Sequence, residues 1–322
     1  YAARTHSIIP VNDCKLGVEE NQIILNEVLS YMKEYHVASY DENTGKGLVR
    51  HVLIRYGFST KELMVCVIIN GNSLPKVEKL IDRLTAIEGM KSISINQNTK
   101  KTNVILGDVT KCIWGDPYIT DMIHLRDTKD FSLTDTAVAY HISPQSFYQV
   151  NPVQPEQLYS LALDRLGISE TDRVLDLYCG VGTLTLLAAR RARKALGIER
   201  VAHSIECARA NARANQLGNA EFLALPVEKA LERDDVKTFA PTLVIADPAY
   251  QGLAGGAAEA LGKLMKTSGA RRLAYISCNP KSFARDAAVL SASGLRLLSV
   301  TPVDMFPGAM HLEVVGIFEA PA

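Results

Sequence analysis

Two residues in the second half of the chain could take part in catalysis: a cysteine at the end of one apolar stretch and a glutamate within another. Cys278 follows the stretch LAYIS, and Glu313 interrupts HLEVVGIF, residues 311–318. A thiolate can add to an electron-poor carbon, and a carboxylate can remove a proton in a later step. A free cysteine is more often a buried packing residue, so the surrounding sequence has to show whether Cys278 is a core residue or a reactive thiol.

A glycine-containing turn, LDLYCGVGTLTL at residues 175–186, has the composition of a strand, a turn and a helix start. Gly180 and Gly182 allow the backbone to approach a ligand at a helix N-terminus. Glu199 ends the next predicted strand, where a carboxylate accepts hydrogen bonds from ribose hydroxyls. Thr185 replaces the third glycine of a dinucleotide fingerprint, so the pattern favours S-adenosylmethionine over a nicotinamide cofactor.

The stretch VIADPAYQG, residues 244–252, places Asp247 at the end of a further predicted strand and leaves two interpretations open. DPPY-like motifs occur in enzymes that methylate exocyclic amines, and Tyr250 would then stack on the base. Alternatively, a thiolate adds to carbon 6 of a pyrimidine, carbon 5 takes up a methyl group, and a base removes the proton from carbon 5. The second interpretation gives both Cys278 and Glu313 a task.

The apolar pattern predicts which elements position these residues. Strands alternate with helices in the second half, and two strands close to the C-terminus predict a hairpin that puts an antiparallel strand into a parallel sheet. The predicted strands there are 173–178, 194–199, 221–225, 242–247, 272–277, 295–303 and 311–319, with helices at 201–215 and 280–292. The first half predicts a small α+β module with helices at 18–35 and 75–87 and strands at 48–58, 63–70, 92–98 and 102–108.

Composition excludes several classes of protein. The chain has 322 residues with 35 Lys plus Arg and 35 Asp plus Glu, so any binding of nucleic acid needs a local basic face. No apolar run approaches the roughly 18 residues that span a bilayer, and the six scattered cysteines are typical of a reducing cytosol. Residues that could form a basic face in the first half are Arg50, Arg55, Lys100, Lys101 and Lys111.

Several segments together resemble the RNA (uracil-5-)-methyltransferase family, which modifies uridines of ribosomal and transfer RNA with S-adenosylmethionine. They are SFYQVNP (146–152), LDLYCGVGT (175–183), DPAYQG (247–252), YISCNP (275–280) and VDMFPGAMHLE (303–313). The resemblance implies an α/β fold, with a Rossmann-like class I methyltransferase domain at residues 145–322 and a mostly parallel seven-stranded sheet. A smaller α+β module at residues 1–144, expected to bind RNA, precedes it.

The resemblance also implies roles for single residues. Cys278 is the expected nucleophile and Glu313 the expected base, and the helix at 280–292 is expected to favour the thiolate with its N-terminal amides. The residues expected to line the cofactor and base pocket are Gln149, Tyr178, Gly180, Gly182, Thr183, Glu199 and Asp247.

The chain departs from the family pattern at two places. Tyr250 and Gln251 stand where the family commonly has Arg and often Lys, which keeps open an RNA-binding homologue with impaired catalysis. Cys14 resembles the last of four cysteines that hold an iron–sulfur cluster in many members, so no cluster and no other metal is expected in this chain. The expected partner is RNA, ribosomal rather than transfer RNA, bound by a cytoplasmic monomer without a membrane partner.

Overall fold

The computed structural model describes residues 8–11, 14, 17–146, 148, 151, 153–253, 255–306 and 312–321. Contacts within the chain divide it into two compact units, Tyr1–Asp121 with Ile142–Val150 and Met122–His141 with Asn151–Ala322. The segment 122–141 therefore groups with the second unit, although the sequence-based division after residue 144 places it in the first. That division into functional domains stays a prediction.

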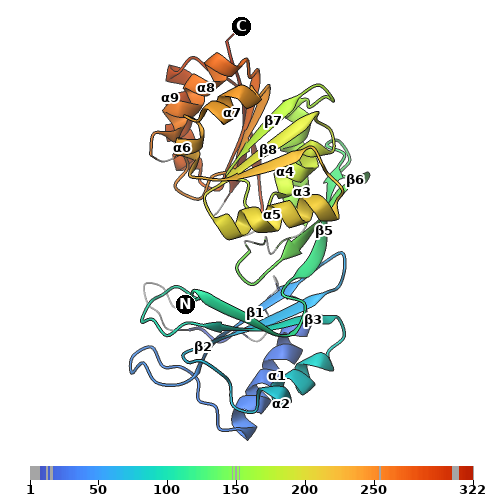
Figure 1. Ribbon diagram of the computed structural model, residues 1–322, viewed down its shortest axis with the longest axis vertical. Helices are drawn as coiled ribbons and strands as arrows, with labels where there is room; N and C mark the ends of the chain where they lie inside the picture. Colours follow the sequence, from blue (N-terminus) through green and yellow to red (C-terminus); the bar gives the residue numbers. More distant parts are fainter. Residues whose placement is uncertain are drawn as a thin grey trace. The chain divides into compact units, whose positions relative to one another are not determined.

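The first unit is a four-stranded sheet with two helices on one of its faces (Figure 1). The strand order is β1-β2-β3-β4; β2 and β3 run parallel, and the other neighbours run antiparallel. Ile24, Val28 and Tyr31 are buried at helical spacing, and the continuously apolar β2 is buried along its length. The elements are α1 (Glu20–Glu34), β1 (Val49–Tyr56), β2 (Leu63–Ile69), α2 (Val77–Thr85), β3 (Met90–Gln97) and β4 (Val109–Gly115).

The second unit is built on a seven-stranded sheet with the order β12-β13-β11-β10-β7-β8-β9. The strands from β9 to β11 run parallel, and β13 is antiparallel to both of its neighbours. The C-terminal hairpin thus inserts one reversed strand, which confirms the predicted topology. The strands are β7 (Arg173–Leu177), β8 (Lys194–Glu199), β9 (Ala220–Ala224), β10 (Leu243–Ala246), β11 (Arg272–Ser277), β12 (Arg296–Val303) and β13 (Glu313–Glu319).

Helices cover both faces of this sheet (Figure 1). One face carries α3 (Val153–Leu166), α4 (Thr183–Ala189) and α5 (Ala202–Ala214). The other face carries α6 (Val227–Ala230), α7 (Asp234–Phe239), α8 (Ala257–Ser268) and α9 (Pro280–Ala292). Among the helices that the structure describes, none is long and apolar enough to cross a membrane.

A two-stranded hairpin of β5 (Ile119–Arg126) and β6 (Leu133–Ile142) is fastened to α5 by two asparagines. The amides of Ala139 and His141 donate to the Oδ1 atoms of Asn215 and Asn211, each at 2.9 Å. The side chains of Asn211 in α5 and of Asn215, the residue directly after this helix, therefore take the place of a third strand along β6.

The predicted strand at residues 102–108 is wrong, because the strand in this region, β4, begins only at Val109. Asn98 Nδ2 donates to the carbonyls of Val104 at 2.7 Å and Ile105 at 3.0 Å. Asn96 Nδ2 donates to the carbonyl of Gly107 at 3.0 Å. Side-chain amides satisfy the backbone acceptors that a neighbouring strand would otherwise have to pair.

Asp172 joins three loops at the edge where the parallel strands begin. Its buried carboxylate accepts from the Arg271 guanidinium, from the Thr242 hydroxyl at 2.7 Å and from the Ser169 amide at 2.8 Å. Arg271 is the main reason why the pKa of Asp172 lies well below its usual range, and the hydroxyl and amide donors add to it.

Asp172→Asn is expected to lower the free energy of unfolding by about 1–3 kcal/mol at neutral pH, because a charged acceptor for donors on three residues is lost. The folded-state pKa is depressed, so this stabilisation is present above the unfolded pKa of about 4 and is lost as pH falls below it. Urea denaturation at several pH values measures the effect, with the exposed Asp234→Asn as control. A difference from wild type that persists unchanged down to about pH 3 would contradict the assignment.

Candidate active site

The carboxyl ends of three neighbouring strands meet at one edge of the seven-stranded sheet. The last residue of β10, Ala246, lies beside the last residue of β7, Leu177, and β11 runs along the other side of β10. Tyr178, Asp247 and Cys278 directly follow these three strands. The topology therefore gathers them at the edge where open α/β sheets bind ligands.

The turn after β7 has a backbone that requires glycine at its end. Tyr178, Gly180 and Gly182 have φ values of 67°, 53° and 88°, and Thr183 begins α4. A Cβ on Gly182 would lie 2.9 Å from Phe222 Cε1, whereas a Cβ on Gly180 would meet no atom of the described residues within 4 Å. Gly182 is needed for packing, and the space beside Gly180 is open to a ligand.

Asp176 of β7 is a buried carboxylate with an unused oxygen. Its Oδ2 accepts from Thr185 Oγ1 at 2.5 Å, while Oδ1 has no hydrogen-bond partner among the described residues. Burial raises the pKa of Asp176 to about 7, and the charges of Asp247 and Glu199 act in the same direction. A buried acceptor without a partner is costly, so this environment fits a ligand that brings a donor or a positive charge.

Glu199 and Tyr178 stand side by side at this edge, because the β7–β8 register pairs the residues just before them, Leu177 and Ile198. Glu199 Oε1 accepts from the Val201 amide at 2.9 Å, which fixes the direction of the carboxylate. Burial raises the pKa of Tyr178 to about 12, so its side chain is a neutral phenol at neutral pH.

Cys278 and Glu313 are brought together by the antiparallel pairing of β11 with β13. The register pairs Ser277 with Val314, so continuing it by one residue puts Cys278 opposite Glu313. Directly opposite residues in such a pair have Cβ atoms roughly 4.5–5.5 Å apart. A thiol and a carboxylate far apart in sequence therefore face each other at the sheet edge.

The prediction that the helix after Cys278 favours a thiolate is wrong. Burial raises the pKa of Cys278, and Glu313 and Asp247 raise it further. The first turn of α9 is already capped, since Asn279 Oδ1 accepts from the Lys281 amide at 3.0 Å. Burial also raises the pKa of Asp247 to about 6 and of Glu313 to about 7. Burial, with a smaller contribution from the charges of Glu313 and Asp247, thus raises the pKa of Cys278, and the resting cysteine is a thiol.

Tyr159 of α3 is a polar side chain near this edge that the sequence analysis does not identify. The helix packs against β11 and β13. Burial raises the pKa of the Tyr159 phenol well above its ordinary value, and the charges of Asp247, Asp176 and Glu313 add to the effect. In sequence, Tyr159 stands among apolar residues at helical spacing and resembles an ordinary core position, so only the fold reveals the carboxylates around it.

Two of the five residues of the predicted basic face of the first unit, Arg50 and Arg55, are used inside the protein. Arg50 donates to three loop carbonyls at 2.8–3.2 Å, and Arg55 donates to another at 3.1 Å. Lys100 forms an ion pair with an aspartate at 2.6 Å. Lys101 and Lys111 are exposed. The two arginines therefore build the unit rather than present free charge.

Two further candidates are not placed at the edge. Gln149 lies outside the described residues. Cys14 is exposed, and the described residues contain no group of three or more His, Cys, Asp or Glu side chains that could hold a metal ion.

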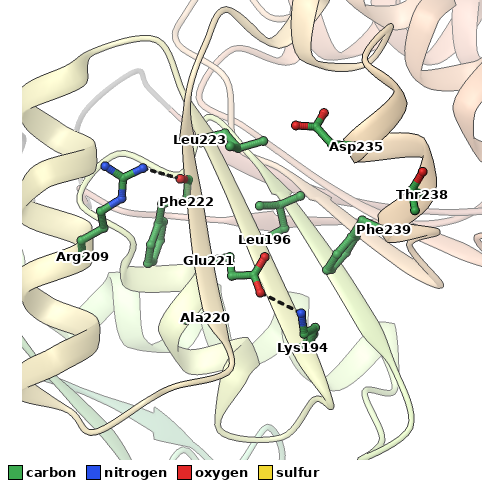
Figure 2. Close-up of a pocket in the computed structure, with 10 residues that line it drawn as sticks. All are labelled: Lys194, Leu196, Arg209, Ala220, Glu221, Phe222, Leu223, Asp235, Thr238 and Phe239. Atoms are coloured by element: carbon green, nitrogen blue, oxygen red, sulfur yellow. Dashed lines mark hydrogen bonds and ion pairs between the residues drawn. The ribbon is translucent and has the colours of Figure 1, made fainter.

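A hollow of about 620 Å³ lies at the β8–β9 end of the sheet and is lined by none of the candidate residues (Figure 2). Lys194 and Glu221 form an ion pair at 2.7 Å across it, and Arg209 donates to the Phe222 carbonyl at 2.8 Å. Its charged walls are satisfied within the protein, so size alone does not identify the site. The lining residues are Lys194, Leu196, Arg209, Ala220, Glu221, Phe222, Leu223, Asp235, Thr238 and Phe239.

The strand order, the glycine turn after β7 and the acidic strand ends define a Rossmann-like methyltransferase fold. The same fold is found in the crystal structure of a Pyrococcus abyssi tRNA (uracil-54, C5)-methyltransferase in complex with S-adenosyl-L-homocysteine. That structure is similar with a TM-score of 0.76 and 25% sequence identity, over 97% of this chain and 70% of that chain.

The chain belongs to the tRNA (uracil-5-)-methyltransferase family, whose model matches residues 116–320. This confirms the family resemblance of the sequence motifs. Two relatives are named uncharacterized RNA methyltransferases: one from Halalkalibacterium halodurans is 38% identical over 99% of this chain, and one from Clostridium acetobutylicum is 35% identical over 98%. The chain spans about two thirds of the length of these relatives, 66% and 65%.

Removing the charge of Glu313 is expected to make Cys278 more reactive. In Glu313→Gln one of the two neighbouring carboxylates is gone, so the pKa of Cys278 falls and its alkylation by iodoacetamide begins at a lower pH. Peptide mass spectrometry over a pH series measures the modification of Cys278. The control Glu319→Gln removes a carboxylate from the far end of β13, where it pairs with Arg296. Equal profiles for wild type and Glu313→Gln would show that the two side chains do not interact.

Proposed function

We propose that this chain methylates carbon 5 of a uridine in RNA. The observation that carries the proposal is the placement of Cys278 opposite Glu313, at the sheet edge that also holds the turn 178–183. Methylation of an exocyclic amine needs no thiol, whereas carbon 5 of a pyrimidine requires addition at carbon 6 and later removal of a proton. The description of the family names the same position of uracil.

The residues at the edge fit S-adenosylmethionine, which supplies a methyl group on a positively charged sulfur. Glu199 would accept hydrogen bonds from the ribose hydroxyls, and the open backbone at Gly180 would lie against the ligand. The raised pKa values of Asp176 and Asp247, about 7 and about 6, indicate an environment that a cation would relieve. Gln149, Tyr178, Gly182 and Thr183 remain predicted contacts.

Glu199→Ala is expected to weaken binding of S-adenosyl-L-homocysteine by roughly tenfold or more, because a charged acceptor of ribose hydroxyls is lost. Isothermal titration calorimetry measures the affinity. Glu221→Ala, which removes an exposed carboxylate from the neighbouring strand β9, is the matched control and should bind like wild type. Equal affinities of the Glu199 and Glu221 variants would remove Glu199 from the cofactor site.

The reaction begins when Cys278 adds to carbon 6 of the uracil. Because the pKa of Cys278 is raised, the thiol must lose its proton as the substrate binds. Asp247, whose charge acts on Cys278, is assigned as the acceptor of that proton, so that Glu313 stays ionised for the later step. Addition makes carbon 5 nucleophilic. Bound S-adenosylmethionine would supply the methyl group, which carbon 5 takes as the bond between the methyl carbon and the sulfonium sulfur breaks and a neutral thioether leaves. Ionised Glu313 removes the proton from carbon 5, the sulfur leaves carbon 6, and the ring double bond is restored. A pKa of about 7 allows Glu313 to accept and release a proton near neutral pH.

The variants of Cys278 and Glu313 are expected to fail at different steps. Cys278→Ala abolishes methyl transfer, since carbon 5 is never activated. Glu313→Gln allows addition and methylation but slows removal of the proton, so RNA accumulates in a covalent adduct with Cys278. A denaturing gel with labelled RNA and S-adenosylmethionine detects the adduct, and Cys207→Ala serves as a cysteine control. Methylation of carbon 5 by Cys278→Ala would end this mechanism, and normal turnover of Glu313→Gln would exclude Glu313 as the base.

The same assay separates the remaining alternatives. Ribosomal RNA is the substrate expected from the sequence, and transfer RNA is tested beside it because the family description and the Pyrococcus abyssi protein name it. An enzyme acting on an exocyclic amine would methylate RNA without an adduct, and an impaired homologue would bind RNA without methylating it. RNA binding by the first unit, where Lys101 and Lys111 are exposed, is part of the proposal. The monomeric state in the cytoplasm stays a prediction.

A further inference from the structure

The loop after β10 is fastened to α9 through its backbone. The Tyr250 carbonyl accepts from Asn279 Nδ2 at 3.2 Å and from Ser282 Oγ at 3.3 Å. The Gln251 carbonyl accepts from Arg285 Nη2 at 2.7 Å. Three side chains of one helix end therefore hold two consecutive peptide units, and the first of these side chains belongs to the residue directly after Cys278.

A buried carboxylate of α9 also fixes the backbone of this loop. Asp286 is 1% exposed, and its Oδ2 accepts from the Leu253 amide at 2.7 Å and from the Tyr275 hydroxyl at 2.6 Å. Gly252 has a φ of 75°, and a Cβ there would lie 2.3 Å from Asp286 Oδ2. The backbone thus has a defined path that leaves the side chains of Tyr250 and Gln251 on the outside.

The aromatic ring of Tyr250, which this loop exposes, does not contribute to the packing of the fold. Tyr250 is 57% exposed, and its side chain has no hydrogen bond or ring contact with the described part of the chain. Lys281 is exposed and forms no ion pair with a described residue. Both line one hollow of about 380 Å³ whose wall contains amides, two hydroxyls, the Lys281 ammonium and the Arg285 guanidinium, and none of its lining residues carries a carboxylate. Arg285 forms an ion pair with the buried Asp286 at 2.7 Å, so Lys281 is the cation of the wall that no described carboxylate pairs. The lining residues of this hollow are Tyr250, Gln251, Asn279, Lys281, Ser282 and Arg285.

We infer that this hollow binds the nucleotide next to the target uridine in the substrate RNA. The inference rests on the proposed function, and it assigns the neighbouring base to the ring of Tyr250 and its phosphate to Lys281. Unstacked RNA bases stack on exposed aromatic rings, and lysines neutralise the phosphates beside them. The hydrogen bonds between the loop after β10 and α9 fix the ring of Tyr250 relative to Cys278. A neighbouring base that stacks on this ring therefore helps to position the target uridine beside the thiol.

The test uses a short single-stranded RNA with one uridine between adenines, and two derivatives that lack the base on the 5′ or the 3′ side of the uridine. Fluorescence anisotropy measures the affinity of the full chain for each RNA. Tyr250→Ala is expected to bind the intact RNA roughly 5- to 100-fold more weakly, and Tyr250→Phe to bind it like wild type. Phe131→Ala removes another exposed aromatic ring and serves as the control.

One of the two abasic RNAs should bind wild type and Tyr250→Ala equally, because the ring has lost its partner. Lys281→Gln should instead weaken all three RNAs and reduce the slope of log affinity against log salt by about 0.7, as expected for one lost phosphate contact on a single strand. Equal affinity of wild type and Tyr250→Ala for intact RNA, or an equal loss on both abasic RNAs, overturns the inference. Adduct formation with Cys278 in the same mixtures tests the proposed function separately, since the affinity measurement requires no turnover.

Discussion

Negative charge crowded at one edge of the seven-stranded sheet is the constraint on which the candidate site depends. Asp176, Asp247 and Glu313 come from three different strands or strand ends, and burial raises their pKa values to about 7, about 6 and about 7. Such a cluster is unfavourable in the resting protein, because each ionised carboxylate is poorly solvated and repels the others. The same cluster favours a cationic ligand, and two of its members, Glu313 and Asp247, add to burial in raising the pKa of Cys278.

The reversed strand β13 is what completes this arrangement. In a parallel sheet the last residues of the strands and the residues just after them reach the carboxyl edge, whereas an antiparallel strand brings its first residue there. Glu313 is that first residue, and the register with β11 sets it opposite Cys278. The hairpin of β12 and β13 thereby adds a carboxylate to an edge that parallel strands alone supply with Tyr178, Asp247 and the thiol.

The helix after the thiol connects catalysis and recognition in the proposed function. Asn279 caps α9 through its Oδ1 and holds the Tyr250 carbonyl through its Nδ2. One side chain thus fixes both the chain direction after Cys278 and the loop that presents the exposed ring. In the first unit, by contrast, Arg50 donates to three loop carbonyls, so its guanidinium supports the fold of that unit.

The sequence by itself determined the strands of the seven-stranded sheet, their topology, the glycine turn and the family, because these depend on local apolar periods and on short motifs. It did not determine the protonation of Cys278, the surroundings of Tyr159 or the loop at residues 102–108. The pKa of Cys278 is raised by burial and then by the carboxylates that β10 and β13 bring near it, and the loop is held by Asn96 and Asn98. Local patterns specify backbone preferences, whereas charge interactions and side-chain hydrogen bonds depend on distances between remote residues, which only the tertiary structure decides.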